Sequence, residues 1–510
     1  MPEPIRRPAL PPADVCERAL NARDARFDGL FFVGITTTGI YCRPVCRTRR
    51  ANSDHRRFFR SAAAAERAGF RPCLRCRPEL APGRAWIDAV PRLAHAAAHR
   101  IGSGALNGRS VAHLAAEFGV TERHLRRALE REVGVSPVEL AQTHRLLLAK
   151  RLLADTGLPV TRIAFASGFQ SLSRFNTVFR ERYRLSPSAL RRSLNSGDDL
   201  LDAHTDQDAA PVPGSDLLRL TLAYRAPLAW DVLVALLRRD AMPEVELVQG
   251  PRYGRTVQLD GRSGVVFAED AAAANGRDPD MQLNVDLSPS LLPALMPLLA
   301  RLRQLFDLDA EPTVVDTCLE QGGLGALVMR RGGVRIPGAF DGFEVASRVL
   351  LRGRGRPGTT TSELAGRVAQ ALGEPLDTGT PGLTRLAPSA ERVADAGASS
   401  LAALGVPRRR AEAVSAVARM VADGELLLEP GSDVTTTRHT LMGIDGVGDR
   451  LATAIVMRAL YWPDAFPTSD RALQRAAGAS NPGQLRDRAE KWRPWRAYAA
   501  LHLWLHDEER

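Results

Sequence analysis

The chain has 510 residues, a hydrophobic fraction of 45% and a formal net charge of +11 at pH 7. This length exceeds what one hydrophobic core supports, so we expect several domains, with enough apolar residues for packed cores. No apolar run approaches the roughly 20 residues of a membrane-spanning helix, which excludes a membrane partner. The first residues lack the apolar stretch of a secretory signal, and we therefore expect a cytoplasmic protein.

Positive charge is concentrated in the first part of the chain. Residues 1–195 contain 34 Lys and Arg against 16 Asp and Glu, a net +18, whereas the remainder contains 35 against 42, a net −7. Clustered positive charge of this kind is typical of a DNA-binding surface. The alternative is a solvated basic surface on an arginine-rich protein, since Lys150 and Lys491 are the only lysines. We predict that the basic part binds nucleic acid.

Four of the six cysteines fall in two short pairs. Three residues separate Cys42 from Cys46, and two separate Cys73 from Cys76. This spacing predicts one tetrahedral zinc site, because soft sulfur ligands in two such pairs suit Zn²⁺. In a cytosolic chain, metal binding is favoured over disulfide formation. A zinc ion with a purely structural role is the alternative to a reactive site.

The segments around both pairs, 36–47 and 68–78, resemble the metal-binding domain of Ada-type DNA alkylation-response proteins. The resemblance covers about residues 10–85, and we assign residues 1–87 to this domain. It implies that all four cysteines bind Zn²⁺ and that Cys42 accepts a methyl group from a methyl phosphotriester in the DNA backbone. Zinc with four thiolates has a net charge near −2, so its sulfurs stay nucleophilic at neutral pH. Methylation leaves about −1, which weakens repulsion of DNA.

Residues 88–195 contain an internal repeat. The segment 111–137 is echoed by 160–187, and each copy reads as a short helix, a glycine turn and a second helix. The second helices are opened by Thr121 and Ser171, both suited to an N-cap. The pattern predicts two helix-turn-helix motifs, and the second copy resembles the signature of AraC-type transcription regulators. The side chains expected to face the DNA groove are Glu122, Arg123, Arg126, Arg127, Gln170, Ser173, Arg174 and Thr177.

These motifs predict double-stranded DNA as the partner, both as alkylated DNA and as promoter operators. A transcriptional activator also implies RNA polymerase as a partner, and we expect a monomer. Residues 196–216 hold six aspartates and no Lys or Arg, which predicts an acidic linker before a separate region.

A second activity is predicted beyond the linker. Residues 441–452 read as a helix, a hairpin containing Gly446 and Gly448, and a new helix. Backbone N–H groups at the positive end of that helix suit a DNA phosphate. Asp470 lies 22 residues beyond Gly448, which matches the arrangement of helix-hairpin-helix DNA glycosylases. The alternative role for Asp470 is a helix N-cap, which Ser469 could equally provide.

The segments 334–344 and 489–504 resemble AlkA-type 3-methyladenine DNA glycosylase II, and the likeness extends along nearly all of residues 217–508. It implies that residues 217–310 form a mixed α/β subdomain and residues 311–510 an all-α helix-hairpin-helix domain. It also implies that Asp470 supports cleavage of the base–sugar bond and that Trp504 is an aromatic residue of the base pocket.

Several positions depart from the AlkA-type pattern. Arg450, Ala454 and Arg471 stand where the family has aromatic rings, and residues 352–356, with Arg354 at their centre, replace a Gln-Leu wedge. A guanidinium in the base pocket repels a cationic base, whereas an aromatic face attracts it. Asp445 replaces the hairpin proline, and its charge faces phosphate unfavourably. The substrate range therefore stays open.

The sequence as a whole predicts a multidomain α/β and mainly α protein, an Ada–AlkA fusion. A zinc domain would accept methyl groups from phosphotriesters, a tandem helix-turn-helix region would activate transcription, and a glycosylase domain would excise alkylated bases such as 3-methyladenine. One alternative is an alkylation-responsive activator whose glycosylase-like domain binds DNA but has lost or altered base excision. Another is a DNA-binding regulator with a structural zinc ion.

Overall fold

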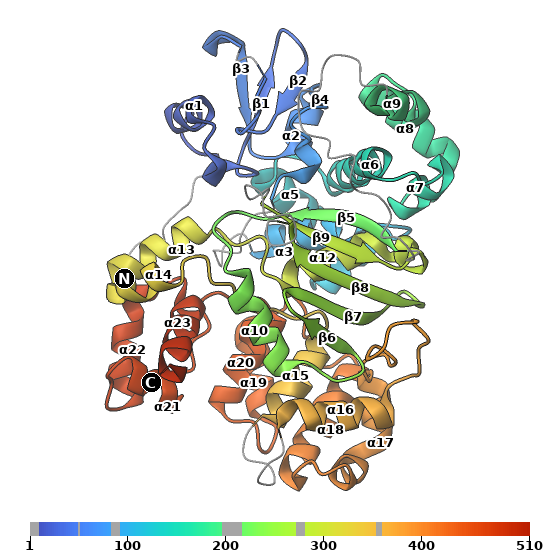
Figure 1. Cartoon of the computed structure of the whole chain (residues 1–510). Coiled ribbons are helices and arrows are strands. Elements are labelled where there is room, and N and C mark those ends of the chain that lie inside the picture. Colours follow the sequence, from blue (N-terminus) through green and yellow to red (C-terminus); the bar gives the residue numbers. More distant parts are fainter. Residues whose placement is uncertain are drawn as a thin grey trace. The chain divides into compact units, whose positions relative to one another are not determined.

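The computed structural model describes residues 10–48, 51–82, 92–195, 217–271, 281–352 and 360–509. The predicted acidic linker and Arg354 lie outside these ranges. The chain divides into two compact units. Figure 1 labels the helices and strands named below. The first comprises Met1–Arg84, Asp88–Arg225 and Leu292–Ala300, and the second Ala85–Ile87, Ala226–Leu291 and Arg301–Arg510. None of the described helices combines the length and apolar character needed to cross a membrane.

The first unit begins with a small α/β module. Its four strands lie in the order β3-β1-β2-β4; β1 is antiparallel to β2 and β3, and β2 is parallel to β4. A tight turn joins β1 to β2, and Gly39 in it has a φ of 65°, which glycine adopts without strain. The elements are α1 (Ala13–Ala22), η1 (Ala25–Phe27), β1 (Phe32–Ile35), β2 (Ile40–Cys42), η2 (Ser53–His55), β3 (Arg56–Phe59), α2 (Ala62–Arg67), β4 (Arg71–Pro72) and η3 (Pro78–Leu80).

The same unit continues with helices that contain the predicted repeat. Thr121 and Ser171 are N-caps, and their hydroxyl oxygens accept hydrogen bonds from the amides of His124 and Arg174. The turns before them contain Gly119 at a φ of 63° and Gly168 at 86°. The tandem helix-turn-helix prediction is therefore confirmed. The elements are α3 (Arg92–Gly102), α4 (Val111–Glu117), α5 (Glu122–Glu132), α6 (Pro137–Asp155), α7 (Val160–Ala166), α8 (Leu172–Tyr183), α9 (Pro187–Asn195) and β5 (Leu218–Ala223).

The second unit contains an antiparallel sheet and helices. Strands β9, β8, β7 and β6 are neighbours in that order, and the longest pairing joins β7 to β8 from Tyr253–Ala268 to Leu259–Arg262. Between residues 226 and 341 the elements are α10 (Trp230–Asp240), β6 (Glu246–Gln249), β7 (Arg252–Leu259), β8 (Arg262–Asp270), β9 (Gln282–Leu287), η4 (Pro289–Ala294), α12 (Leu295–Leu305), α13 (Pro312–Leu319), the π-helical η5 (Glu320–Leu324) and α14 (Gly325–Arg330). Of these, the end of η4 and the start of α12, Leu292–Ala300, belong to the first unit.

In the described residues from 342 onward, the regular elements are helices, as predicted for a helix-hairpin-helix domain, and isolated β-bridges occur only at Pro375, Leu383 and Arg385. Val345, Val417 and Ile455 contribute to one core, and Leu473 and Ala500 contribute to another. The elements are α15 (Gly342–Leu351), α16 (Thr361–Leu372), α17 (Ala390–Ala403), α18 (Arg408–Ala422), α19 (Val434–Met442), α20 (Asp449–Ala459), α21 (Arg471–Ala476), α22 (Pro482–Ala489), η6 (Glu490–Trp492) and α23 (Arg496–Glu508).

A buried charged network holds the sheet against α15. Arg255 on β7 donates to Glu344 on α15 at 2.8 Å, and Arg348 on α15 lies 2.9 Å from Glu246 on β6. All four side chains are less than 10% exposed. Buried charges persist in proteins when they are paired in this way. The network therefore fixes α15, whose C-terminal end at Leu350 and Leu351 adjoins the hairpin region described below.

Candidate functional site

The two cysteine pairs meet at one point of the α/β module. Cys42 ends β2 and Cys73 directly follows β4, and the parallel pairing of Tyr41 with Pro72 brings these cysteines side by side. The amide of Cys73 donates to the carbonyl of Tyr41 at 3.0 Å. All four sulfur atoms, including those of Cys46 and Cys76, lie within 4.8 Å of one another. The backbone thus assembles four ligands from two separate segments.

Neighbouring polar groups contact two of the sulfur atoms, and Cys42 is buried. The Arg43 amide donates to the sulfur of Cys76 at 3.3 Å, and the Thr48 hydroxyl lies 3.1 Å from the sulfur of Cys46. Hydrogen bonds to ligand sulfurs orient them and stabilise their negative charge. Cys42 is 7% exposed, so the residue expected to react retains only a small opening to solvent.

The protonation of these thiols shows why the cluster suits a cation. Hydrogen bonds with the other three cysteines, first Cys42, lower the pKa of the Cys46 thiol far below its ordinary value. The same pairing raises the pKa of Cys42 far above its own. Four sulfurs this close cannot all be thiolates without a compensating cation, because their charges repel. Zn²⁺ accepts four sulfurs in tetrahedral geometry, and the donor set fits it.

The two predicted DNA-reading helices, α5 and α8, share one pattern of burial. Leu125 and Leu129 on α5, and Phe175 and Phe179 on α8, are 0% exposed, so each pair four residues apart packs inward. The opposite faces expose Arg123, Arg127, Ser173, Arg174 and Thr177, and Gln170 is exposed just before the N-cap of α8.

One predicted contact of α5 is already engaged within the chain. The Arg126 guanidinium is half-buried and pairs with Glu122 at 2.5 Å. Both side chains were predicted to face the groove, and they keep 40% and 39% exposure while the i,i+4 spacing on one helix allows them to pair. That Arg126, Arg127, Ser173 and Arg174 contact DNA stays a prediction.

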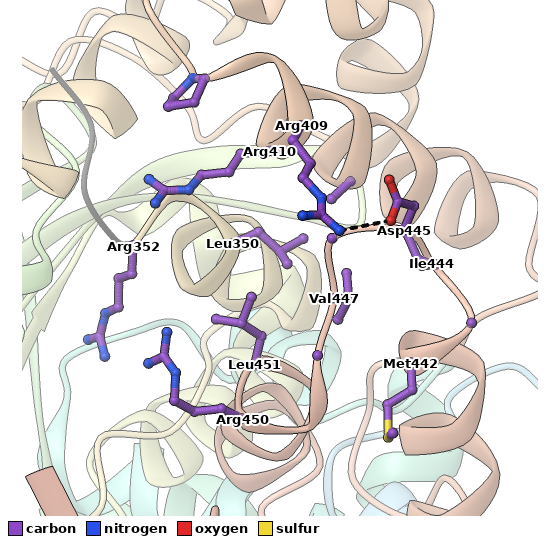
Figure 2. A pocket seen from close by; sticks show the side chains of 15 residues that line it. Leu350, Arg352, Arg409, Arg410, Met442, Ile444, Asp445, Val447, Arg450 and Leu451 are labelled. Atoms are coloured by element: carbon purple, nitrogen blue, oxygen red, sulfur yellow. Dashed lines mark hydrogen bonds and ion pairs between the residues drawn. The ribbon is translucent and has the colours of Figure 1, made fainter. Parts of the chain in front are cut away.

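In the second unit, the predicted hairpin joins α19 to α20 and borders an open cavity of about 880 Å³. Figure 2 shows Arg352, Arg409, Arg410 and Arg450 around it, and Asp445 is the one acidic residue among the described residues that line it. Burial, together with the neighbouring Arg450 guanidinium, lowers the pKa of Arg410. Like charges gathered beside a helix N-terminus form a site for an anion such as a phosphate.

The hairpin backbone has the geometry expected for phosphate contact. Gly446 has a φ of 88°, and Gly448 is the N-cap of α20. Within the described residues, neither of their amides donates to a backbone carbonyl or a side chain, so both remain available. Asp445 pairs with Arg409 at 3.1 Å (Figure 2). This ion pair offsets the negative charge that we expected to oppose phosphate binding.

Asp470 lies beside two other predicted site residues. Asp470 is the N-cap of α21, which is the alternative role considered above. Its Oδ1 accepts hydrogen bonds from the amides of Ala472 at 2.9 Å and Leu473 at 3.1 Å. The indole of Trp504 donates to the same oxygen at 3.4 Å. The other oxygen, Oδ2, lies 3.8 Å from Arg450 Nη1. One oxygen is thus fixed by the helix, while the other faces the arginine.

Sequence reasoning missed part of this arrangement. Arg409 and Arg410 line the cavity but were not predicted as site residues. The available signal was a run of three arginines after Pro407, where α18 begins. Ser469 does not act as the cap; its hydroxyl donates to Asp449 at 3.4 Å.

Family models match successive parts of the chain. The metal binding domain of Ada matches residues 15–79, a helix-turn-helix domain matches 114–193, and the AlkA N-terminal domain matches 219–341. A "probable bifunctional transcriptional activator/DNA repair enzyme AlkA" of Mycobacterium tuberculosis is 36% identical over 494 residues, covering 96% of this chain and 95% of the relative.

Two further relatives match separate parts. DNA-3-methyladenine glycosylase 2 of Escherichia coli is 33% identical over 284 residues, covering 56% of this chain and 96% of the relative. The bifunctional transcriptional activator/DNA repair enzyme Ada of the same organism is 33% identical over 158 residues, covering 31% of this chain and 43% of the relative.

A four-cysteine metal site, two helix-turn-helix motifs and a hairpin with a nearby aspartate together define a class of DNA-repair proteins that also regulate transcription. Within that class, the chain belongs to the family of bifunctional transcriptional activators and DNA repair enzymes that join an Ada-type region to an AlkA-type region.

The metal site can be tested by removing a ligand. Cys76→Ala should lose the single zinc ion per chain and unfold the α/β module, because metal binding and folding are coupled in so small a domain. Metal analysis and hydrogen exchange over residues 10–82 measure both effects. Cys318→Ala, in the other unit, is the control and should retain zinc. Full zinc content in Cys76→Ala would contradict the assignment.

Proposed function

We propose that the chain performs two repair reactions and converts the first into a transcriptional signal. Its α/β module accepts a methyl group from a DNA methyl phosphotriester on Cys42, and its second unit releases alkylated bases from DNA. RNA polymerase contact by the methylated protein, a monomeric state and a cytoplasmic location are parts of the same proposal. The observation that carries the proposal is that two groups of side chains each come together. The four cysteines meet in the α/β module, and Trp504 and Arg450 lie beside Asp470 in the second unit.

Methyl transfer follows from the chemistry of Cys42. A bound zinc ion would keep the four sulfurs ionised at neutral pH. The Cys42 sulfur then attacks the methyl carbon of the phosphotriester, a carbon–sulfur bond forms, and the carbon–oxygen bond breaks to leave a phosphodiester. The thioether that results does not return to a thiolate, so each chain reacts once. The loss of one negative charge weakens repulsion between this region and the DNA backbone.

Exposure to duplex DNA with a methyl phosphotriester should methylate Cys42, and peptide mass mapping identifies the residue. The methylated protein should also bind its operator more tightly, with a gain that shrinks as salt rises, because reduced charge repulsion is screened by ions. A methyl group on Cys73 would refute the role of Cys42. An operator gain of equal size at every salt concentration would refute charge as its cause.

Base release follows from the position of Asp470. An alkylated purine already carries positive charge and leaves readily once it is flipped out of the helix. As the base–sugar bond breaks, the carboxylate stabilises the cationic sugar, and water then adds to the sugar carbon. The α21 amides hold Oδ1 in place, so Oδ2 can face the sugar. The arginine-lined cavity beside the hairpin suits the phosphates that hold the DNA in register.

Asp470→Asn tests this role directly. The amide oxygen can still cap α21 and the hairpin still offers its amides, so DNA affinity should stay nearly unchanged. Release of free base from alkylated duplex should fall at least about 100-fold, the usual scale for loss of one electrostatic stabiliser. Chromatography of released bases measures it. Release at the unaltered rate would remove Asp470 from the reaction.

The second candidate function is an alkylation-responsive activator whose glycosylase-like unit binds DNA without excising bases. Arg450 favours it, because its guanidinium stands 3.8 Å from Asp470 where an aromatic face would attract a cationic base. This residue offers a way to separate the two candidates.

Arg450→Trp should speed the release of 3-methyladenine, since it exchanges repulsion for stacking. The matched control Arg409→Trp alters an arginine of the same cavity that pairs with Asp445 instead of Asp470. Arg409→Trp should release 3-methyladenine no faster than the wild-type chain does. Absence of release from both the wild-type chain and Arg450→Trp would select the second candidate.

A further inference from the structure

The α/β module is attached to the first helix-turn-helix through the end of α5. Arg60 donates to the carbonyls of Arg131 at 2.9 Å and Glu132 at 3.0 Å, and Arg67 donates to that of Gly134 at 2.9 Å. Guanidinium groups at a helix C-terminus satisfy its last carbonyls and complement the helix dipole. These contacts lie at the surface, where charge interactions are weak.

The attachment to the second helix-turn-helix is different in kind, because a buried carboxylate makes it. The side chain of Glu66, on α2, is 0% exposed. It accepts from the Tyr41 hydroxyl at 3.0 Å and from the Thr143 hydroxyl at 2.9 Å, and it lies 3.4 Å from Arg182. Tyr41 immediately precedes Cys42, Thr143 belongs to α6, and Arg182 belongs to α8. One carboxylate thus joins three separate elements.

A second buried group ties the cysteine cluster to α6. Lys150, whose side chain is 1% exposed, donates to the carbonyl of Cys73 at 3.3 Å and pairs with Glu79 at 2.6 Å. Helix α6 connects the two helix-turn-helix motifs. The backbone of the ligand Cys73 is therefore held by α6, and the side chain of Tyr41, next to the ligand Cys42, is linked through Glu66 to α6 and α8.

A methyl group on Cys42 adds volume in a nearly closed site and removes charge from it. Cys42 is 7% exposed and Tyr41 is 0% exposed. Protein interiors are close-packed and transmit small displacements. The hydroxyl of Tyr41 has Glu66 as its partner, and Glu66 also contacts Thr143 and Arg182, so a shift of Cys42 has a direct route to α6 and α8.

We propose that Glu66 is a positioning residue that couples the methyl acceptor to the second helix-turn-helix. Methylation of Cys42 then changes operator affinity in two ways: through loss of charge, which salt screens, and through the placement of α8, which salt leaves intact. The inference rests on the methyl-acceptor role proposed for Cys42. It adds a route from the repaired phosphotriester to the second DNA-reading helix.

The test compares operator affinity before and after methylation, in full-length protein, at low salt and at about 0.3 M salt, where the Debye length is about 6 Å. The probe is a duplex selected from a random-sequence pool by the methylated wild-type chain, and the methyl donor is a duplex with one methyl phosphotriester. Glu66→Gln removes the buried charge and keeps the shape. Glu181→Gln removes the same charge from an exposed position next to Arg182 and is the matched control.

Wild type and Glu181→Gln should retain a gain of about tenfold at the higher salt, within the 5–150-fold range of coupled sites. Glu66→Gln should bind zinc and accept methyl as wild type does, yet lose that gain. If Glu66→Gln does not fold, Thr143→Val breaks one contact of the carboxylate and should reduce the gain. A gain at the higher salt that survives both substitutions, or that wild type lacks, overturns the coupling. Failure of wild type to accept methyl would instead refute the proposed role of Cys42.

Discussion

Four sulfur atoms within 4.8 Å of one another need a cation between them, and much of the first unit is arranged around that requirement. The parallel pairing of β2 with β4 brings Cys42 and Cys73 together, and neighbouring amide and hydroxyl groups cover the sulfurs. Because thiolates in a zinc site remain charged at neutral pH, the same arrangement that folds the module also makes it nucleophilic. Stability and reactivity of this module therefore have one origin.

In the second unit, a negative charge has to lie close to positive charges. The base release proposed for it needs one carboxylate near the sugar, while DNA binding needs positive charge nearby. The chain separates the two by giving the oxygens of Asp470 different tasks: Oδ1 caps α21, and Oδ2 faces Arg450. The other arginines line the hairpin cavity, where phosphate contact is expected. This arrangement leaves the Arg450 guanidinium 3.8 Å from Asp470. In the proposed reaction, it would repel a cationic base.

Local signals in the sequence predicted local features well. Thr121 and Ser171 predicted two helix starts, because an N-cap depends on residues close together in the chain. The metal cluster joins two separate segments, and it was predicted because each segment carries its own closely spaced cysteine pair. Glu66 and Lys150 were not predicted to have a role, although Lys150 is one of only two lysines. Lys150 is 71 residues from Glu79, and Glu66 is 77 residues from Thr143 and 25 from Tyr41. Such contacts depend on tertiary packing that no local pattern encodes.

The arginines that line the hairpin cavity likewise could not be predicted from the sequence alone. In a chain with so many of them, a guanidinium that lines a cavity looks the same in sequence as one that faces solvent. Arg409 and Arg410 can be identified as site residues only from the fold, which brings the start of α18 beside the hairpin. The pairing of Arg409 with Asp445 likewise joins residues 36 positions apart, and it offsets the negative charge that we expected to oppose phosphate binding.

The central claim is that one chain carries two separate repair reactions on methylated DNA. Methyl-labelled duplex incubated with full-length protein tests it most directly, with label counted both on protein and in released free bases. The account predicts that Cys42→Ser abolishes protein labelling and leaves base release intact, whereas Asp470→Asn does the reverse. Loss of both products in either variant, or absence of labelled protein and of free base from wild type, would contradict it.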